Sequence, residues 1–181
     1  MITKETRLKG CFILEPKVFE DERGYFFESY NEELFNKLTE TQTIFVQDNQ
    51  SFSSKGVLRG LHYQTGEWAQ AKLVRVVSGA VLDVAVDMRK ESGTYGEYVA
   101  VELSDKNKKQ LFVPRGFAHG FVVLSDTAEF FYKCDNFYNK ASEAGIIFND
   151  KDLSIDWKLP KDSLIVSEKD WQLPSFSSNE L

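Results

Sequence analysis

The sequence is poor in the residues from which metal sites and disulfide frameworks are built. Its 181 residues include two histidines and two cysteines, and Cys11 and Cys134 have neither a CxxC nor another metal-type spacing. Two thiols could form one disulfide, but two reduced, partly buried cysteines are the simpler expectation. A metal site in a β-barrel typically needs His-x-His and a carboxylate, whereas this sequence reads His62-Tyr63-Gln64. We therefore expect no metal.

Long apolar runs and excess positive charge are also missing. No segment approaches the roughly 20 apolar residues that a membrane helix needs. Residues 1–10 contain no apolar core of a signal peptide. The net charge of −6 argues against a nucleic-acid or membrane-surface partner. We expect a cytoplasmic protein, and an anionic ligand would need a locally basic site.

Aromatic and β-branched residues are abundant instead. The chain contains 15 Phe, 7 Tyr and 3 Trp, and 42% of its residues are hydrophobic. Short strand-like runs alternate with turn signals, a pattern typical of an all-β sandwich or barrel. No repeat, low-complexity tract or linker interrupts residues 1–181, which are long enough for a single domain with a sizeable core.

Three local patterns give more specific expectations. Two β-branched runs flank Ser78-Gly79 and predict a hairpin over residues 71–89. Residues 31–40 predict a short helix, for which Ser29 and Glu32 resemble a capping box. After residue 139 the chain becomes more polar, which indicates a loop-rich wrap with a short helix near residues 140–144.

The stretch GVLRGLHYQ, residues 56–64, places a histidine and an arginine in an apolar, strand-like setting. Arg59 and His62 have opposite parity, so an ideal strand would point them to opposite faces. A bulge at Gly60 would bring both into one pocket. His62 suits proton transfer, because imidazole titrates near neutral pH. Asp83 and Asp170 are both candidates for the carboxylate that would fix its tautomer.

Three further side chains are candidates for chemistry. Tyr132 could donate a proton as a phenol, although core packing explains most tyrosines in so aromatic a chain. Lys72 could stabilise a developing oxyanion, or could be a charge at a strand end. His119 shares a strand face with Phe117 and Phe121, which fits a core histidine as well as a pocket residue.

Six segments, in order, resemble one family. They are DERGYFFESY, QDNQSFSSKGVLRGLHYQ, QAKLVRVVSGAVLDVAVDMR, FVPRGFAHGFVVLSD, FYKCDNFY and SEKDW. Together they resemble the dTDP-4-dehydrorhamnose 3,5-epimerases over about residues 1–175. The resemblance implies a cupin-type jelly-roll barrel, a homodimer, and an epimerase without cofactor that acts on dTDP-4-dehydro-6-deoxyglucose. Gln64 stands where a metal-binding cupin would have its second histidine.

The resemblance also implies roles for individual residues. His62 matches the base, Asp170 its carboxylate partner, Tyr132 the acid, and Lys72 the group near the substrate's C4 oxygen. Ten other residues match positions that bind the nucleotide sugar, with Tyr138 stacking on the base: Arg23, Phe26, Glu28, Gln47, Asn49, Arg59, His119, Tyr138, Glu143 and Lys169.

Small departures from the family pattern leave the chemistry in place. Ala69 stands where proline is expected, and Asn136-Phe137 replaces a more usual Asp-Tyr pair. Other activities compatible with the sequence are a mono-epimerase of C3 or C5, a cupin ketoisomerase, and a nucleotide-sugar-binding jelly roll without catalysis. The combination of His62, Tyr132 and Lys72 favours an enzyme over the binding jelly roll, and the family resemblance favours the 3,5-epimerase. A mono-epimerase could keep His62 and Tyr132, so the residues alone separate these two activities poorly.

Overall fold

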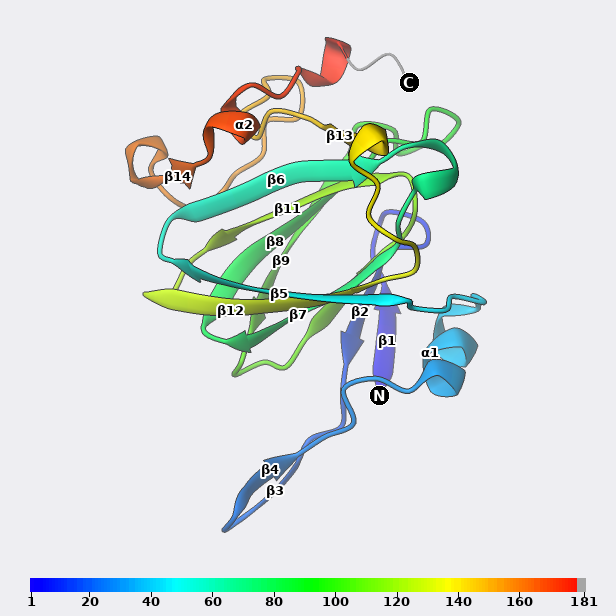
Figure 1. Cartoon of the computed structure of the whole chain (residues 1–181). Helices are drawn as coiled ribbons and strands as arrows, with labels where there is room; N and C mark the ends of the chain where they lie inside the picture. Colours follow the sequence, from blue (N-terminus) through cyan, green and yellow to red (C-terminus); the bar gives the residue numbers. More distant parts are fainter. Residues whose placement is uncertain (179–181) are drawn as a thin grey trace.

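Two β-sheets face each other in the computed structural model, which describes residues 1–178 (Figure 1). The first sheet has the strand order β1 (Ile2–Glu5), β2 (Phe12–Glu15), β10 (Gln110–Val113), β7 (Lys72–Ser78), β12 (Thr127–Cys134) and β5 (Gln47–Ser54). The second has the order β13 (Glu143–Gly145), β6 (Val57–Gln64), β11 (Phe117–Val123), β8 (Ala80–Asp87) and β9 (Tyr98–Ser104), and β14 (Ile165–Val166) pairs with β6. The expected all-β jelly roll is confirmed.

The main core lies between the two sheets. Alternate residues of each strand point inward, where apolar side chains are removed from water. Val74 and Val76 of the first sheet belong to the same buried cluster as Val81 and Ala85 of the second. This core fills one part of the interior, and a pocket with both polar and apolar walls occupies the space beside β5 and β6.

The C-terminal segment covers the outer face of the second sheet (Figure 1). Phe148 and Trp157 are buried there in one cluster with Leu82 and Val122, and the Trp157 indole donates to the carbonyl oxygen of Phe148 at 2.9 Å. Because β8 and β11 are covered on both faces, nearly all of their residues are buried. The expected loop-rich wrap is thus confirmed, and it continues the core.

The predicted helix forms as α1 (Glu32–Thr39), but its predicted cap was wrong. Asn31, directly before the first helical residue, accepts a hydrogen bond from the Leu34 amide at 3.0 Å. Asn31 is the N-cap because its side chain stands one residue before the helix, whereas Ser29 lies too far upstream.

The remaining helices are short. They are η1 (Gly66–Trp68), η2 (Lys140–Ser142), η3 (Lys161–Ser163), α2 (Glu168–Trp171) and η4 (Phe176–Ser178). The helical turn η2 fulfils the expectation near residues 140–144. Within residues 1–178, no helix combines the length and the apolar character required to cross a bilayer.

The predicted hairpin around Ser78-Gly79 is wrong. Strand β7 pairs with β10 and β12, and β8 pairs with β9 and β11, so Gly79 carries the chain from one sheet to the other. Gly79 has φ +83°, and a Cβ there would lie 2.1 Å from the Thr127 carbonyl oxygen. The turn signal was therefore real, but β-propensity identifies strands without identifying their partners.

A small hairpin projects from the body of the fold (Figure 1). It consists of β3 (Phe19–Asp21) and β4 (Gly24–Phe26), joined by a turn at Glu22 and Arg23. Phe26 is 70% exposed, and Phe19 and Tyr25 are also exposed. Such a concentration of aromatic side chains in water is typical of an interaction surface.

Candidate active site

A β-bulge in β6 aligns the two residues that sequence parity separates. Strand β11 pairs His119 with His62 and Phe121 with Arg59, so Gly60 and Leu61 together oppose Gly120. Gly60 has φ +128°, and a Cβ on it would lie 2.6 Å from the Cα of Gly120. The expected bulge is confirmed, and it requires glycine.

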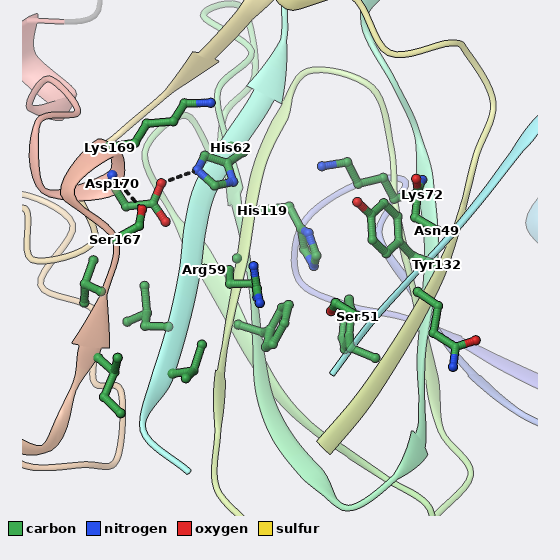
Figure 2. A pocket seen from close by; sticks show the side chains of 18 residues that line it. Asn49, Ser51, Arg59, His62, Lys72, His119, Tyr132, Ser167, Lys169 and Asp170 are labelled. Atoms are coloured by element: carbon green, nitrogen blue, oxygen red, sulfur yellow. Dashed lines mark hydrogen bonds and ion pairs between the residues drawn. The ribbon is translucent and has the colours of Figure 1, made fainter. Parts of the chain in front are cut away.

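Arg59 and His62 consequently line one pocket of about 620 Å³ between the sheets, a size ordinary for a small-molecule site. Figure 2 shows side chains from both sheets and from α2 converging on it. Eight of the fourteen residues expected at the site line this pocket: Asn49, Arg59, His62, Lys72, His119, Tyr132, Lys169 and Asp170.

His62 and Asp170 form a hydrogen-bonded pair at 2.7 Å, between Nε2 and Oδ1 (Figure 2). Asp170 lies on α2, where its amide donates to Ser167 Oγ, and its Oδ2 accepts from the Gly60 amide at 3.2 Å. Burial opposes ionisation of Asp170, but His62 and these donors hold its pKa below the ordinary value. An ionised Asp170 accepts a hydrogen bond from the Nε2–H of His62, which leaves the lone pair on Nδ1 as the basic site of the ring.

The second histidine has a different carboxylate. His119 Nε2 lies 2.9 and 3.1 Å from the two carboxylate oxygens of Asp83, and both side chains are buried. The ring of Phe130 stacks on His119 with centroids 6.2 Å apart. Of the two carboxylates considered for His62, Asp170 is therefore its neighbour, and Asp83 is the neighbour of His119.

Lys72 and Tyr132 approach the pocket from the first sheet, opposite His62. The Lys72 ammonium lies 5.9 Å from the centroid of the Tyr132 ring. Burial lowers the pKa of Lys72, although the nearby Cys134 and Asp83 oppose this, and burial raises the pKa of Tyr132. No hydrogen bond or ion pair engages the Lys72 ammonium within the described chain. Its charge is therefore available to an oxygen of a ligand.

Arg59 is held by a neutral partner. Its Nε and Nη2 both donate to Ser53 Oγ at 3.2 Å, and Ser53 itself is buried. Two other cations of the first sheet and its neighbourhood face carboxylates instead: Lys133 faces Asp48, and Arg115 faces Asp135. A guanidinium oriented by a hydroxyl keeps its full positive charge for an anion.

Hydrogen bonds connect three further expected residues, Gln47, Tyr138 and Glu143, to the pocket residues Asn49 and Lys169. The Tyr138 hydroxyl donates to Glu143 at 3.0 Å, and Lys169 donates to the other oxygen of that carboxylate at 2.7 Å. Gln47 accepts from the Tyr138 amide at 3.1 Å and donates to Asn49 Oδ1 at 3.1 Å. Burial opposes ionisation of Glu143, but Lys169 and Tyr138 hold its pKa below the ordinary value.

Three expected residues lie away from this pocket. Arg23 and Phe26 are on the projecting β3–β4 hairpin, and Glu28 follows it, exposed, in the segment before α1. Arg23 donates to Asp21 in the same hairpin. The pocket of one chain therefore contains none of the three.

Sequence reasoning missed part of the pocket wall. Ser51 lies two residues beyond Asn49 on β5, so the parity that relates Gln47 to Asn49 would have found it. Ile165 and Val166 line the pocket because β14 pairs in parallel with β6, and no local pattern predicts that pairing. The other wall residues that the sequence did not predict are Gln50, Val57, Leu58, Gly120, Phe121, Phe130 and Ser167.

Within residues 1–178, no group of three or more His, Cys, Asp and Glu residues is arranged to hold a metal ion. Cys11 and Cys134 are free and buried, and burial raises the pKa of Cys11 to about 12 and that of Cys134 to about 11.

Comparison with known proteins identifies the family. The family model described as dTDP-4-dehydrorhamnose 3,5-epimerase matches residues 5–178. The enzyme of that name from Salmonella typhimurium is 57% identical over 157 residues, which cover 87% of this chain and 86% of the relative. The crystal structure of the enzyme from Elizabethkingia anophelis has a TM-score of 0.96 at 60% identity, covering 99% of this chain and 98% of that one.

A third relative carries a bound sugar nucleotide. The structure of a dTDP-6-deoxy-D-glucose-3,5-epimerase from Legionella pneumophila, in complex with dTDP-4-keto-L-rhamnose, has a TM-score of 0.94 at 46% identity. The match covers 98% of this chain and 94% of that one. Fold, motifs and relatives agree, and the chain belongs to the dTDP-4-dehydrorhamnose 3,5-epimerase family of isomerases.

Proposed function

We propose that this pocket converts dTDP-4-dehydro-6-deoxy-D-glucose to dTDP-4-dehydro-L-rhamnose, with His62 as the base and Tyr132 as the acid. The C4 ketone acidifies the C–H bonds at C3 and C5. Removal of either proton places negative charge on the C4 oxygen as an enolate. Protonation of the same carbon on the opposite face of the ring inverts its configuration, and a second cycle inverts the other carbon.

The observation that carries this proposal is that the candidate base and the candidate acid lie on opposite walls of the pocket. His62 enters the pocket from β6 of the second sheet, whereas Tyr132 enters from β12 of the first (Figure 2). A sugar ring between them would present one face to the base and the other to the acid. General acid–base catalysis of this kind typically contributes about 10²–10⁴-fold.

Lys72 is the group that we assign to the enolate. It stands beside Tyr132 and forms no ion pair among the described residues, as stated above. A cation that is already oriented when charge develops stabilises that charge better than water, which must reorganise. Asp170 keeps the Nε2 proton of His62 in place and stabilises the imidazolium that forms.

The nucleotide explains the other polar residues. Arg59 and Lys169 are cations for the diphosphate. Tyr138 stacks on the pyrimidine base. His119 borders the sugar. Binding energy from the remote nucleotide offsets the cost of positioning the sugar.

The protein acts, in this proposal, as a homodimer. Arg23, Phe26 and Glu28 match nucleotide-sugar positions, yet they lie on or next to a hairpin that points away from their own pocket (Figure 1). Both facts are accounted for if this hairpin reaches the pocket of a second copy, since a two-fold dimer gives each copy the same contact.

Mixed dimers test this arrangement. One protomer carries His62→Ala, and the other carries Arg23→Ala with Phe26→Ala. If the hairpin acts on the partner's pocket, the hybrid has one intact site and regains activity that both parents lack. If the hairpin acts within its own chain, the hybrid stays as inactive as its parents, and the dimer proposal fails.

We also assign the enzyme to the cytoplasm, with residues 1–181 forming one catalytic domain. The two free thiols are in keeping with a reducing compartment.

Proton exchange in D₂O tests the activity itself. The protein is incubated with dTDP-4-dehydro-6-deoxy-D-glucose and followed by NMR. Deuterium at both C3 and C5, absent with His62→Ala, is the expected result. Label at a single carbon would identify a mono-epimerase. Binding without any exchange would identify a nucleotide-sugar-binding jelly roll.

A further inference from the structure

Gln64 is a buried polar residue that the mechanism above does not use. It lies on β6 two residues beyond His62 and is 6% exposed. Its amide nitrogen donates to the carbonyl oxygens of Trp68 at 2.7 Å and Phe137 at 3.1 Å, and its amide oxygen accepts from the Asn139 amide at 2.6 Å. Both amide protons and the oxygen are therefore engaged, as a buried amide requires.

Two of these three hydrogen bonds enclose a single residue. The Phe137 carbonyl and the Asn139 amide belong to the peptide groups on either side of Tyr138. The Tyr138 amide is bound to Gln47, and its hydroxyl is bound to Glu143. The backbone at Tyr138 is thus fixed from β6 and β5, while the residue as a whole remains 55% exposed. An exposed aromatic ring on so constrained a backbone is ready to stack on a flat ligand.

We propose that Gln64 is a positioning residue for nucleotide binding, which holds residues 137–139 so that the Tyr138 ring is preorganised for the pyrimidine base. This inference rests on the proposed function, in which Tyr138 meets the base. Without Gln64, the loop after β12 loses its link to β6, and the ring has to be ordered when the nucleotide binds. That ordering costs conformational entropy and weakens binding without changing any group at the reacting carbons.

Gln64 has a second possible route to the chemistry, which the experiment has to separate. Its bond to Trp68 anchors η1, and the chain continues from η1 to Lys72, the first residue of β7. A residue that acted through Lys72 would change kcat. A residue that acts through Tyr138 changes KM and nucleotide affinity and leaves kcat nearly constant.

Two variants of Gln64 and one matched control form the experiment. Gln64→Glu keeps the acceptor for Asn139 and removes both donors, and Gln64→Met removes all three hydrogen bonds at similar volume. Gln42→Glu makes the same chemical change at an exposed site before β5 and serves as the control. Affinity for dTDP is measured by calorimetry, and kcat and KM are measured with the nucleotide sugar.

We expect both Gln64 variants to bind dTDP about tenfold more weakly and to raise KM similarly, with kcat within about threefold of the unmodified enzyme. In a Tyr138→Ala background, Gln64→Met should cause no further loss of affinity, because the ring that it positions is absent. Unchanged dTDP affinity, a full additional loss in that background, or a fall in kcat at constant KM would overturn the proposal.

A measurement on the unmodified protein covers the case in which neither variant folds. Hydrogen exchange at the Asn139 amide should be slow without ligand, since Gln64 already binds it. Exchange as fast as in an exposed loop would contradict the preorganised platform. If the unmodified protein binds dTDP normally but shows no turnover, the proposed reaction is refuted. The role of Gln64 in nucleotide binding is then still decided by the dTDP affinities of its variants.

Discussion

His62 Nε2 and Asp170 Oδ1 lie 2.7 Å apart, although 108 positions separate the two residues in the chain. The carboxylate is buried, and a second donor, the Gly60 amide, comes from the bulge that orients His62. The bulge at Gly60 therefore both orients His62 and supplies a hydrogen bond to Asp170. The pair determines which nitrogen of His62 carries a proton.

Asp170→Asn should reduce the rate of C–H exchange about 10²–10⁴-fold. An amide can donate to Nε2, and the imidazole proton then moves to Nδ1, the nitrogen that has to act as base. Exchange into the sugar in D₂O measures the effect, while dTDP affinity should stay within about threefold. The control is Glu168→Gln, an exposed residue of the same helix. A normal exchange rate in Asp170→Asn would exclude this carboxylate from catalysis.

Lys72 should determine the alkaline limit of activity. Burial lowers its pKa, so the ammonium is lost, and activity falls, at a lower pH than for an ordinary lysine. Tyr132 does not impose this limit, because burial raises its pKa and keeps the phenol protonated to higher pH. In Lys72→Arg the positive charge persists to higher pH. The alkaline limb of the kcat–pH profile should therefore shift to higher pH, even if the maximal kcat is lower. An unmoved limb would show that another group titrates there.

Gly60→Ala should destabilise the protein and misalign the pocket. The new Cβ would meet the Gly120 Cα at 2.6 Å on a backbone with φ +128°. We expect a loss of more than about 2 kcal/mol in the free energy of unfolding, measured with urea, and a lower kcat. Gly93→Ala is the control, since no atom lies within 4 Å of its Cβ position and its φ is not positive. Equal effects of the two substitutions would contradict the role assigned to the bulge.

Asp87 should make stability depend on pH in acid. Its carboxylate is fully buried, and burial opposes ionisation, but donors from Arg89, Ser92 and Thr94 lower its pKa to about 2. The folded pKa is below the unfolded one, so the stabilisation is complete above about pH 4 and is lost as pH falls towards 2. It amounts to roughly 2 kcal/mol.

Urea unfolding between pH 2 and 7 measures this contribution. Asp87→Asn should be less stable at pH 7, and its free energy of unfolding should change less between pH 4 and 2. Parallel pH dependences for the two proteins would assign the acid sensitivity to other carboxylates.

Much of the fold could be predicted because strand periodicity is local. The alternation of Gln47 and Asn49, and the glycine that lets Arg59 and His62 share a pocket, follow from residues next to each other in the chain. The pairing of β7 with β10 and β12 could not be predicted in this way, because partners are chosen by packing between distant segments.

The same limit applies to the site. Residue patterns left Asp83 and Asp170 equal as partners of His62, and the family resemblance favoured Asp170. The chain geometry separates the two carboxylates, since Asp83 faces His119 and Asp170 faces His62. Parity likewise gave no sign that Arg23 and Phe26 would lie on a projecting hairpin, because a strand's period does not specify where the strand points.

The C-terminal wrap has a consequence for synthesis on the ribosome. When residue 160 has been made, β6 and the strands of Lys72 and Tyr132 already exist, but the carboxylate for His62 does not. Until α2 has been made, His62 therefore has no carboxylate at its Nε2. In the proposed mechanism, full activity therefore has to wait until α2 lies against β6, so the catalytic pair is completed by one of the last elements to be synthesised.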